Sequence, residues 1–183
     1  MVRSRPLLFA LLALVLAMGG TTAAVAAPTG SPPGHSQGVG AFDEEDVLRT
    51  LNRWALAYDD HTLDMETRLA MMEDCFTDDA SFIYDATDFH AEWHGIDEVM
   101  ALFEGALASQ NDVRRHVMTN SIVERVDRRT AHVTSYLTLV VVADPHGAPE
   151  VVSSGIYRDT VKLEKDGVWR IQVRHLTLDT PPQ

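Results

Sequence analysis

The chain has 183 residues and a formal net charge of −12, from 27 acidic and 15 basic side chains. Nucleic acids and anionic membranes repel so acidic a protein, so neither is expected as a partner. The single cysteine, Cys75, excludes an internal disulfide, so packing alone must stabilise the fold. Its flank, Asp74-Cys75-Phe76, favours a buried thiol with a structural role.

The first 26 residues have the pattern of a secretory signal peptide. Arg3 and Arg5 precede an apolar run over 7–18, and Ala24-Val25-Ala26 has the small-x-small form of a cleavage site. The run is short for a membrane span, and an uncleaved N-terminal anchor is the alternative reading. We therefore expect a secreted or extracytoplasmic protein without stable membrane insertion.

A linker separates this signal from one folded domain. Residues 27–41 are rich in Pro, Gly and Ser and contain no aromatic side chain, which predicts a disordered tether. The folded domain is expected over 42–179, followed by a tail over 180–183. This length is sufficient for a hydrophobic core.

The first part of the domain is predicted to be largely helical. Asp43 is a good N-cap, and apolar residues at helical spacing follow it as far as Tyr58. Asp59 then lies on the flank of the apolar stripe, near the end of this helix. Further helices are expected over 62–72 and 95–109.

The remainder is predicted to be β-structure. Residues 76–80 suggest a turn, residues 81–84 a short strand, and four longer segments are rich in Val, Ile, Thr and Tyr. These strands are expected at 115–126, 131–143, 150–164 and 168–178. The pattern predicts an α+β domain with three helices on one face of an antiparallel sheet.

Two distant segments carry the most informative chemistry. Tyr58-Asp59-Asp60-His61 ends the first helix, and residues 114–120 open a strand that contains His116. An imidazole and a carboxylate in one apolar cavity make a general base, in which the carboxylate fixes the tautomer and stabilises the imidazolium. Spacing alone favours a simpler alternative, a core histidine bound to a backbone carbonyl.

Strand alternation and helix position identify the side chains expected near this base. His116, Met118, Asn120 and Ile122 alternate onto one strand face. A carboxylate at a helix C-terminus is unfavourable for the helix dipole, so Asp59 on the apolar flank is preferred as the partner, with Asp60 as the solvated neighbour.

Five motifs occur in order along the domain: Ala57-Tyr58-Asp59, Phe76-Thr77-Asp78-Asp79-Ala80, Arg115-His116-Val117-Met118-Thr119-Asn120, Gly155-Ile156-Tyr157-Arg158-Asp159 and Asp166-Gly167-Val168-Trp169-Arg170-Ile171. With these motifs the chain resembles the SnoaL-like group of the nuclear transport factor 2-like superfamily. The resemblance covers about 43–177 and is greatest for the branch that includes scytalone dehydratase and hexachlorocyclohexane dehydrochlorinase.

The resemblance implies a cone-shaped, cystatin-like fold whose curved sheet wraps around the helices and encloses an apolar pocket. It implies that Asp59 and His116 match the carboxylate–histidine pair of the family. Tyr58 falls where the dehydratase has a tyrosine that polarises the substrate carbonyl, and Tyr84 falls near its second such tyrosine.

This chain also departs from the dehydratase pattern. The stretch 137–142 has no titratable residue where the dehydratase has another active-site histidine. The dehydratase's pocket asparagine falls near Arg158, and the dehydrochlorinase has an arginine in that region, so Arg158 could contact an anionic leaving group. Met118 and Asn120 are the other expected substrate contacts.

No metal and no cofactor are expected. His90 and His94 have the spacing of a helical metal pair, with Glu92 between them, but this stretch reads as extended or irregular, and spacing fixes no third ligand.

The leading functional hypothesis is a cofactor-independent lyase of dehydratase type, acting on a small apolar molecule such as a polyketide-like metabolite. His116, Asp59 and Tyr58 would be catalytic. The alternatives are an isomerase or cyclase using the same pair, a non-catalytic small-molecule-binding module, and an obligate dimer whose open sheet face is its interface. A homo-oligomer, dimer or trimer, is the expected assembly.

Overall fold

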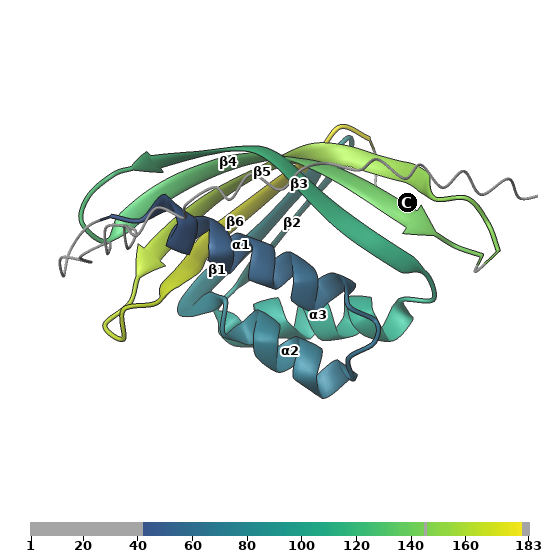
Figure 1. Cartoon of the computed structure of the whole chain (residues 1–183), viewed down its shortest axis with the longest axis horizontal. Coiled ribbons are helices and arrows are strands. Elements are labelled where there is room, and N and C mark those ends of the chain that lie inside the picture. Colours follow the sequence, from purple (N-terminus) through teal and green to yellow (C-terminus); the bar gives the residue numbers. More distant parts are fainter. Residues whose placement is uncertain (1–41, 145, 181–183) are drawn as a thin grey trace, which may run out of the picture. The chain divides into compact units, whose positions relative to one another are not determined.

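The computed structural model describes residues 42–144 and 146–180, so the predicted signal peptide, the linker and most of the tail lie outside the described residues. Three helices cover one face of a curved, unclosed six-stranded sheet (Figure 1), which confirms the predicted α+β class. In chain order the elements are α1 (Glu44–Asp59), α2 (Met65–Glu73), β1 (Phe76–Ala86), β2 (Phe89–His94), α3 (Ile96–Ser109), β3 (Val113–Arg125), β4 (Thr130–Val142), β5 (Glu150–Leu163) and β6 (Trp169–Leu178).

The strand order in the sheet is β2-β1-β6-β5-β4-β3. Four strand pairs are antiparallel, β1–β2, β3–β4, β4–β5 and β5–β6, but β1 and β6 pair parallel, so the sheet is mixed rather than wholly antiparallel. The parallel pair arises because α3 carries the chain from β2 to the far edge of the sheet, and the meander β3–β6 then returns to β1. None of the helices in the described part of the chain is long and apolar enough to cross a membrane.

The predicted turn over residues 76–80 is wrong, because β1 already begins at Phe76. The backbone N–H of Ile171 on β6 donates to the Cys75 carbonyl at 2.8 Å, and Phe76 pairs with Ile171. Pairing with a strand far away in sequence overrides the local turn propensity of Asp78 and Asp79. The ladder is irregular between Phe76 and Ser81.

Local sequence determines where the helices begin. Asp43 caps α1 by accepting a hydrogen bond from the Glu45 N–H at 2.9 Å, and acidic residues fill the first turn. Asp64 caps α2 by accepting from the Thr67 N–H at 2.8 Å, so this helix begins later than predicted. The predicted helix start at Thr62 instead forms a turn in which Thr62 donates to the Asp60 carboxylate.

The core lies between the helices and the inner face of the sheet. Its centre is the Trp54 indole, whose ring centroid lies 5.7 Å from that of Tyr58, 5.8 Å from that of Phe103 and 5.9 Å from that of Tyr157. Burying each such side chain contributes roughly 1.5–3 kcal/mol or more. This aromatic cluster fixes the end of α1 against the sheet.

A buried ion pair lies directly behind Trp54. Arg174 on β6 donates to both carboxylate oxygens of Asp159 on β5, at 2.8 and 2.9 Å, and both side chains are fully buried. The Arg174 guanidinium lies 4.2 Å from the Trp54 ring centroid and 4.5 Å from that of Tyr157. The cation therefore stabilises both aromatic rings as well as the sheet.

Candidate functional site

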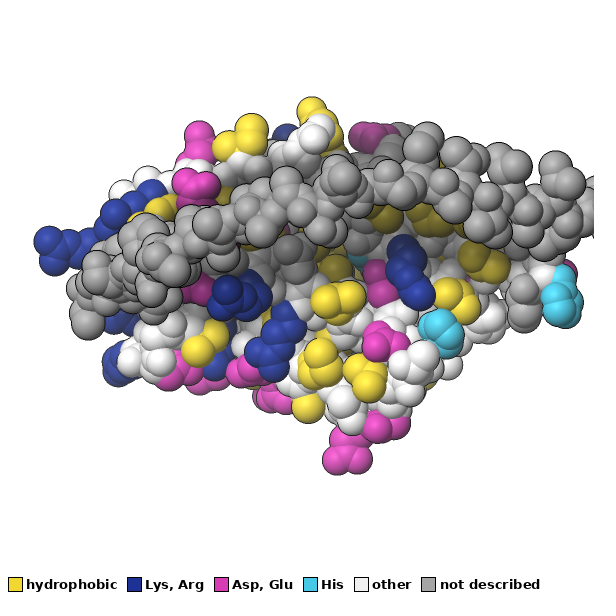
Figure 2. Space-filling view, in the orientation of Figure 1, with side chains coloured by type: hydrophobic (Ala, Val, Ile, Leu, Met, Phe, Trp, Pro, Cys, Tyr) yellow, Lys and Arg dark blue, Asp and Glu magenta, His cyan; other side chains and the backbone are white. Residues whose placement is uncertain are grey.

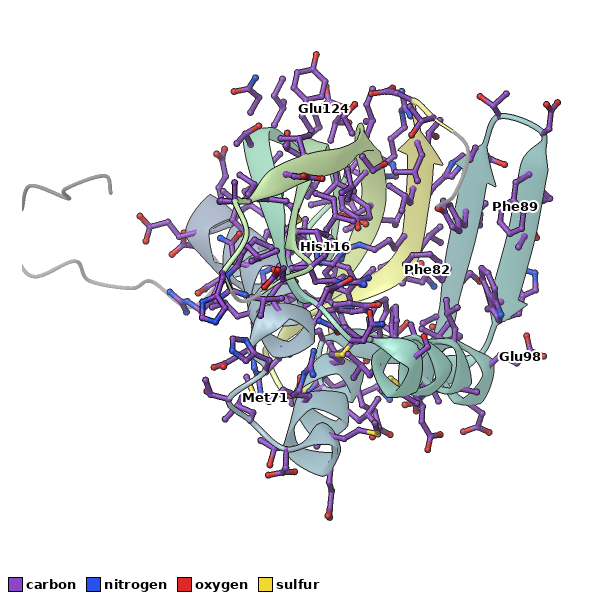
Figure 3. All side chains as sticks on the ribbon, turned by 90° about the vertical axis from the view of Figure 1, so that its right-hand side faces the viewer. Met71, Phe82, Phe89, Glu98, His116 and Glu124 are labelled. Carbon is purple, nitrogen blue, oxygen red and sulfur yellow. The ribbon has the colours of Figure 1, made fainter. Side chains whose placement is uncertain are left out.

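The structure brings Asp59 and His116 into direct contact. The Asp59 Oδ1 atom lies 2.7 Å from Nδ1 of His116, and Asp59 Oδ2 accepts a hydrogen bond from the backbone N–H of His116 at 2.6 Å. Only 8% of the Asp59 side chain and 10% of the His116 side chain are exposed. Figure 3 shows His116 in the interior, between the sheet and the helices.

This contact determines the histidine tautomer. An ionised carboxylate only accepts hydrogen bonds, so Nδ1 of neutral His116 carries the proton and donates to Asp59. The lone pair is then on Nε2, at the opposite edge of a ring that lines a cavity. Asp59 lies behind the imidazole and does not line the cavity. This is the arrangement of a histidine base oriented by an acid.

Two arginines stabilise an acid at the end of α1, where the helix dipole disfavours it. The last turn of α1 contains no basic residue. Arg68 on α2 donates instead to the Ala57 carbonyl at 3.1 Å and to the Tyr58 carbonyl, and Arg115 Nη1 donates to the Asp59 carbonyl at 3.0 Å. These cations satisfy helix-end carbonyls and offset the unfavourable dipole.

Tyr58 packs edge-on against the imidazole ring of His116. Its ring centroid is 4.8 Å from that of His116, and the two rings are inclined at 74°. Burial raises the pKa of the Tyr58 hydroxyl, while the positive charges of Arg114 and Arg68 partly oppose this shift. Tyr58 therefore remains a protonated hydrogen-bond donor at the cavity wall.

A cavity of about 340 Å³ opens in front of His116. This volume is at the lower end of the range of roughly 300–1,000 Å³ that is usual for small-molecule sites. The cavity is walled mostly by apolar and aromatic side chains; the lining residues are Trp54, Tyr58, Phe82, Tyr84, Leu102, Phe103, Ala106, Arg114, His116, Leu137, Leu139, Ser153, Tyr157, Leu176 and Leu178. A larger hollow of about 730 Å³ lies between α2 and the β5–β6 turn, but most of its lining side chains are charged or polar.

Of the predicted substrate contacts, the structure places Tyr84 in the cavity wall. Its ring centroid lies 5.3 Å from that of Phe89, and burial raises the pKa of its hydroxyl. Met118 is half-buried on the same strand face as His116, but it packs into the core and does not line the cavity.

The expected position of Arg158 is corrected by the structure. Arg158 pairs with Thr134 and His175 on the outer face of the sheet, whereas its neighbours Tyr157 and Asp159 point inward. An error of one residue in register moves a strand residue to the opposite face. Arg158 is therefore exposed and remote from the cavity.

Asn120 is also displaced from its expected position. The β3–β4 ladder is irregular between Thr119 and Ile122, and Asn120 has a φ of 52°, a left-handed conformation that asparagine tolerates better than most residues. The bulge leaves Asn120 exposed and reverses the alternation, so Ile122 points outward with 63% exposure.

The sequence interpretation missed several cavity residues. Arg114 and Ser153 both line the cavity, and the Oγ of Ser153 and Nε1 of Trp54 are buried without a hydrogen-bond partner among the described residues. Strand alternation places Arg114 on the same face as His116, so Arg114 could have been predicted from the sequence in the same way. Ser153 follows an irregularity in the β4–β5 ladder that the sequence does not reveal.

The histidines of β2 face outward, away from the cavity. His90 and His94 lie on either side of Glu92, with their Nε2 atoms 3.1 and 3.0 Å from its two carboxylate oxygens. Across residues 42–144 and 146–180, no group of three metal-ligating side chains is arranged to hold a metal ion. In Figure 3, Phe89 marks the same outermost strand, far from His116.

Comparisons with solved structures show the fold. A protein of unknown function with a cystatin-like fold from Nostoc punctiforme has a TM-score of 0.59 at 20% identity, over 75% of this chain and 91% of that chain. ActVI-ORFA from Streptomyces coelicolor has a TM-score of 0.62 at 21% identity, over 74% and 97% of the two chains. A candidate scytalone dehydratase from Novosphingobium aromaticivorans has a TM-score of 0.59 at 20% identity, over 75% and 84%.

The family relationship comes from the sequence. Among curated proteins, no match to this chain is found. The model of the SnoaL-like domain, in contrast, matches residues 41–175, which include all nine helices and strands of the described residues except the last residues of β6. The chain has a cystatin-like fold and belongs to the SnoaL-like domain family.

Proposed function

We propose that this protein is a cofactor-independent lyase that eliminates water, or another leaving group, from a small and largely apolar carbonyl compound. The single observation that carries the proposal is the contact between Asp59 Oδ1 and His116 Nδ1 at 2.7 Å, in a histidine that lines a largely apolar cavity. A core histidine satisfied by a backbone carbonyl would not need a buried carboxylate.

The proposed reaction begins with proton removal. Nε2 of His116 takes a proton from the carbon next to the substrate carbonyl, and the C–H electron pair moves into the new carbon–carbon double bond of an enolate. The Tyr58 hydroxyl donates a hydrogen bond to the oxygen that becomes negative. Asp59 stabilises the imidazolium formed at His116.

Elimination completes the cycle. The enolate re-forms the carbonyl, its double bond shifts by one carbon, and the bond to the β-hydroxyl breaks. The His116 imidazolium returns its proton to the departing hydroxyl, which leaves as water, so the enzyme regains its starting protonation state. The net change is loss of one water molecule and formation of one conjugated double bond.

Family membership and the solved structures support this choice of reaction. The likeness to a candidate scytalone dehydratase favours dehydration of a polyketide-like substrate, and the mostly apolar lining of the cavity agrees with such a substrate. The absence of a second histidine over 137–142 means that one imidazole would act as both base and acid.

The test is proton exchange and product formation with β-hydroxyketones and hydroxytetralones in deuterated water. Wild type should exchange the proton next to the carbonyl and release the unsaturated ketone. His116→Ala should slow both by roughly 10²–10⁴-fold, the usual contribution of a positioned acid–base group. His132→Ala, an exposed histidine of β4, is the matched control.

The outcomes separate the competing functions. Exchange without elimination would indicate an isomerase or cyclase that uses the same enolate. Binding of these compounds without any exchange would indicate a non-catalytic module and would contradict the proposal.

We further propose that the protein is exported. The support is the signal-like pattern of residues 1–26, which precedes the described residues. The mature protein recovered from the culture medium should begin at Ala27, and retention of residues 1–26 would contradict cleavage.

A further inference from the structure

Arg114 is a cation in the wall of an otherwise largely apolar cavity. It precedes His116 by two residues on β3, so both side chains project from the same strand face, at a backbone spacing of roughly 6–7 Å. Only 24% of its side chain is exposed. The proposed elimination gives this charge no role, since the base, its orienting acid and the carbonyl donor are other residues.

Asp112 holds the guanidinium in a fixed orientation. Arg114 donates from Nε and Nη2 to the two carboxylate oxygens of Asp112, at 2.8 and 2.7 Å. This two-point contact fixes the plane of the guanidinium and leaves Nη1 with no partner among the described residues. An oriented cation with spare N–H groups is well suited to bind an anionic oxygen.

Ser153 supplies a second unsatisfied polar group on the same wall. His116 pairs with Leu139, which pairs with Ser153, so the three side chains form one row across β3, β4 and β5. The Ser153 Oγ is buried without a partner among the described residues. Leaving such a group unpaired is unfavourable, so a ligand atom is its natural partner.

Arg114 and Ser153 also mark where the cavity continues. Both residues line the main cavity and an adjoining hollow of about 290 Å³, which Asp112 borders as well. Together they form a polar end in a space that is otherwise mostly apolar. A substrate with an apolar skeleton and one charged end matches this division.

We propose that Arg114 is a specificity residue that binds a carboxylate on the substrate, with the Ser153 hydroxyl as a second donor. The inference rests on the proposed function, because it names the substrate class of that site: an apolar, ring-sized carbonyl compound that carries a carboxylate. The formal net charge of −12 repels anions in general, so this local cation selects the acidic substrate that fits the cavity.

A binding experiment tests this inference independently of catalysis. The probes are 2-naphthoate and its neutral counterpart 2-naphthamide, titrated at pH 7 while the tryptophan fluorescence is followed. Trp54 lines the cavity, so occupancy should alter its emission. Wild type should bind the carboxylate about ten- to hundredfold more tightly than the amide, as expected for a charge-assisted hydrogen bond.

Variants locate the effect. Arg114→Met should abolish the preference for 2-naphthoate and leave the affinity for 2-naphthamide within about twofold, whereas Arg114→Lys should retain part of the preference. Ser153→Ala should weaken binding of the carboxylate several-fold. Arg158→Met removes an exposed arginine from the outer face and should change neither affinity. Circular dichroism and thermal melting verify that each variant is folded.

Failure of this inference can be distinguished from failure of the proposed lyase function. His116→Ala should still prefer 2-naphthoate to 2-naphthamide, because the anion contact is made by Arg114 and not by the base, even if both affinities change with the cavity wall. Equal binding of the two probes by wild type, no binding of either, or equal losses for both probes in Arg114→Met would overturn the inference. If wild type binds 2-naphthoate selectively but has no lyase activity, the lyase proposal is contradicted and the carboxylate site is still supported.

Discussion

The carboxylate of Asp59 accepts two hydrogen bonds from one residue, His116: one from its backbone N–H at 2.6 Å and one from Nδ1 at 2.7 Å. The two oxygens of one side chain therefore fix both the strand backbone and the ring that projects from it. A rotation of the imidazole would break the contact with Oδ1, while the contact with Oδ2 keeps β3 against the end of α1. The proposed base is thus already oriented in the free protein.

This double contact predicts the effect of Asp59→Asn. The amide oxygen can still accept from the backbone N–H of His116, but the amide NH₂ would then face Nδ1. A neutral ring would accept this hydrogen bond at Nδ1 and carry its proton on Nε2, which is the wrong tautomer for a base. Turnover should fall roughly 10²–10⁴-fold in steady-state kinetics with a substrate identified in the exchange experiment. Asp60→Asn is the control, because the Asp60 carboxylate contacts only Thr62 in an exposed turn. Equal losses in both variants would contradict an orienting role for Asp59.

The two arginines at the end of α1 should differ in their contributions to stability. Arg68 is 8% exposed and satisfies two helix-end carbonyls, so Arg68→Met should lower the free energy of unfolding by about 2–4 kcal/mol. Arg115 is exposed, and Arg115→Met should lower it by less than about 1 kcal/mol. Urea unfolding measures both, with the exposed Arg49→Met as control. The reverse order would contradict this assignment.

How far the sequence predicts the site depends on whether a contact is local. Helical spacing places Asp59 on the apolar flank, and strand alternation places His116 on one face of its strand. Their pairing was implied only by the family resemblance, because spacing alone favoured a core histidine. The same alternation is wrong for Asn120, because a bulge interrupts it. The prediction for Arg158 was wrong by one residue in register: the strand alternation places its neighbour Tyr157 on the inner face, and therefore Arg158 on the outer face.

The long-range features of the fold were not predicted. The parallel pairing of β1 with β6 joins segments about 90 residues apart, and no local pattern specifies it. The Arg174–Asp159 pair and the contact of Arg68 with α1 likewise depend on which faces meet. The charges of α1 gave one indication of such a contact. This helix ends in Asp59 and has no basic residue in its last turn, so a cation from another element is needed to offset the helix dipole.

Acidic and basic side chains are mixed on the surface of the domain. Figure 2 shows acidic and basic side chains interspersed over the helical side of the domain, with acidic groups at its lower edge. The proposed chemistry instead depends on two charged groups near the cavity, the buried carboxylate of Asp59 and the half-buried guanidinium of Arg114.

The buried ion pair behind Trp54 should be essential for stability. Asp159→Asn or Arg174→Met leaves one buried charge without its partner, and each should lower the free energy of unfolding by about 3–5 kcal/mol. The double variant should lose less than the sum of the two single losses, since neither charge then remains. Denaturant unfolding measures the cycle. Asp166→Asn, which removes an exposed partner of Arg170, should cost less than about 1 kcal/mol. Additive losses at Asp159 and Arg174 would contradict direct coupling.

Cys75 should make stability depend on pH in the alkaline range. Burial raises the pKa of its thiol to about 11, whereas an unfolded thiol ionises near 8.5. The native state therefore holds this proton longer than the unfolded state. The stabilisation is fully present below about pH 8.5 and is lost as the pH rises towards 11. Its total is about 3 kcal/mol, because the pKa rises by about 2.5 and each pKa unit corresponds to about 1.36 kcal/mol.

The comparison of wild type with Cys75→Ala isolates this contribution, because the raised pKa values of Tyr58 and Tyr157 affect both proteins alike. As the pH increases from 7 to 10.5, the free energy of unfolding in urea should fall for wild type relative to the variant.

A labelling experiment tests the same burial. A thiol reagent such as dithionitrobenzoate should modify native wild type slowly at pH 8 and the unfolded chain at once, since native Cys75 is 1% exposed. Rapid labelling of the native protein, or a difference independent of pH, would show that this thiol is accessible to water and ionises normally.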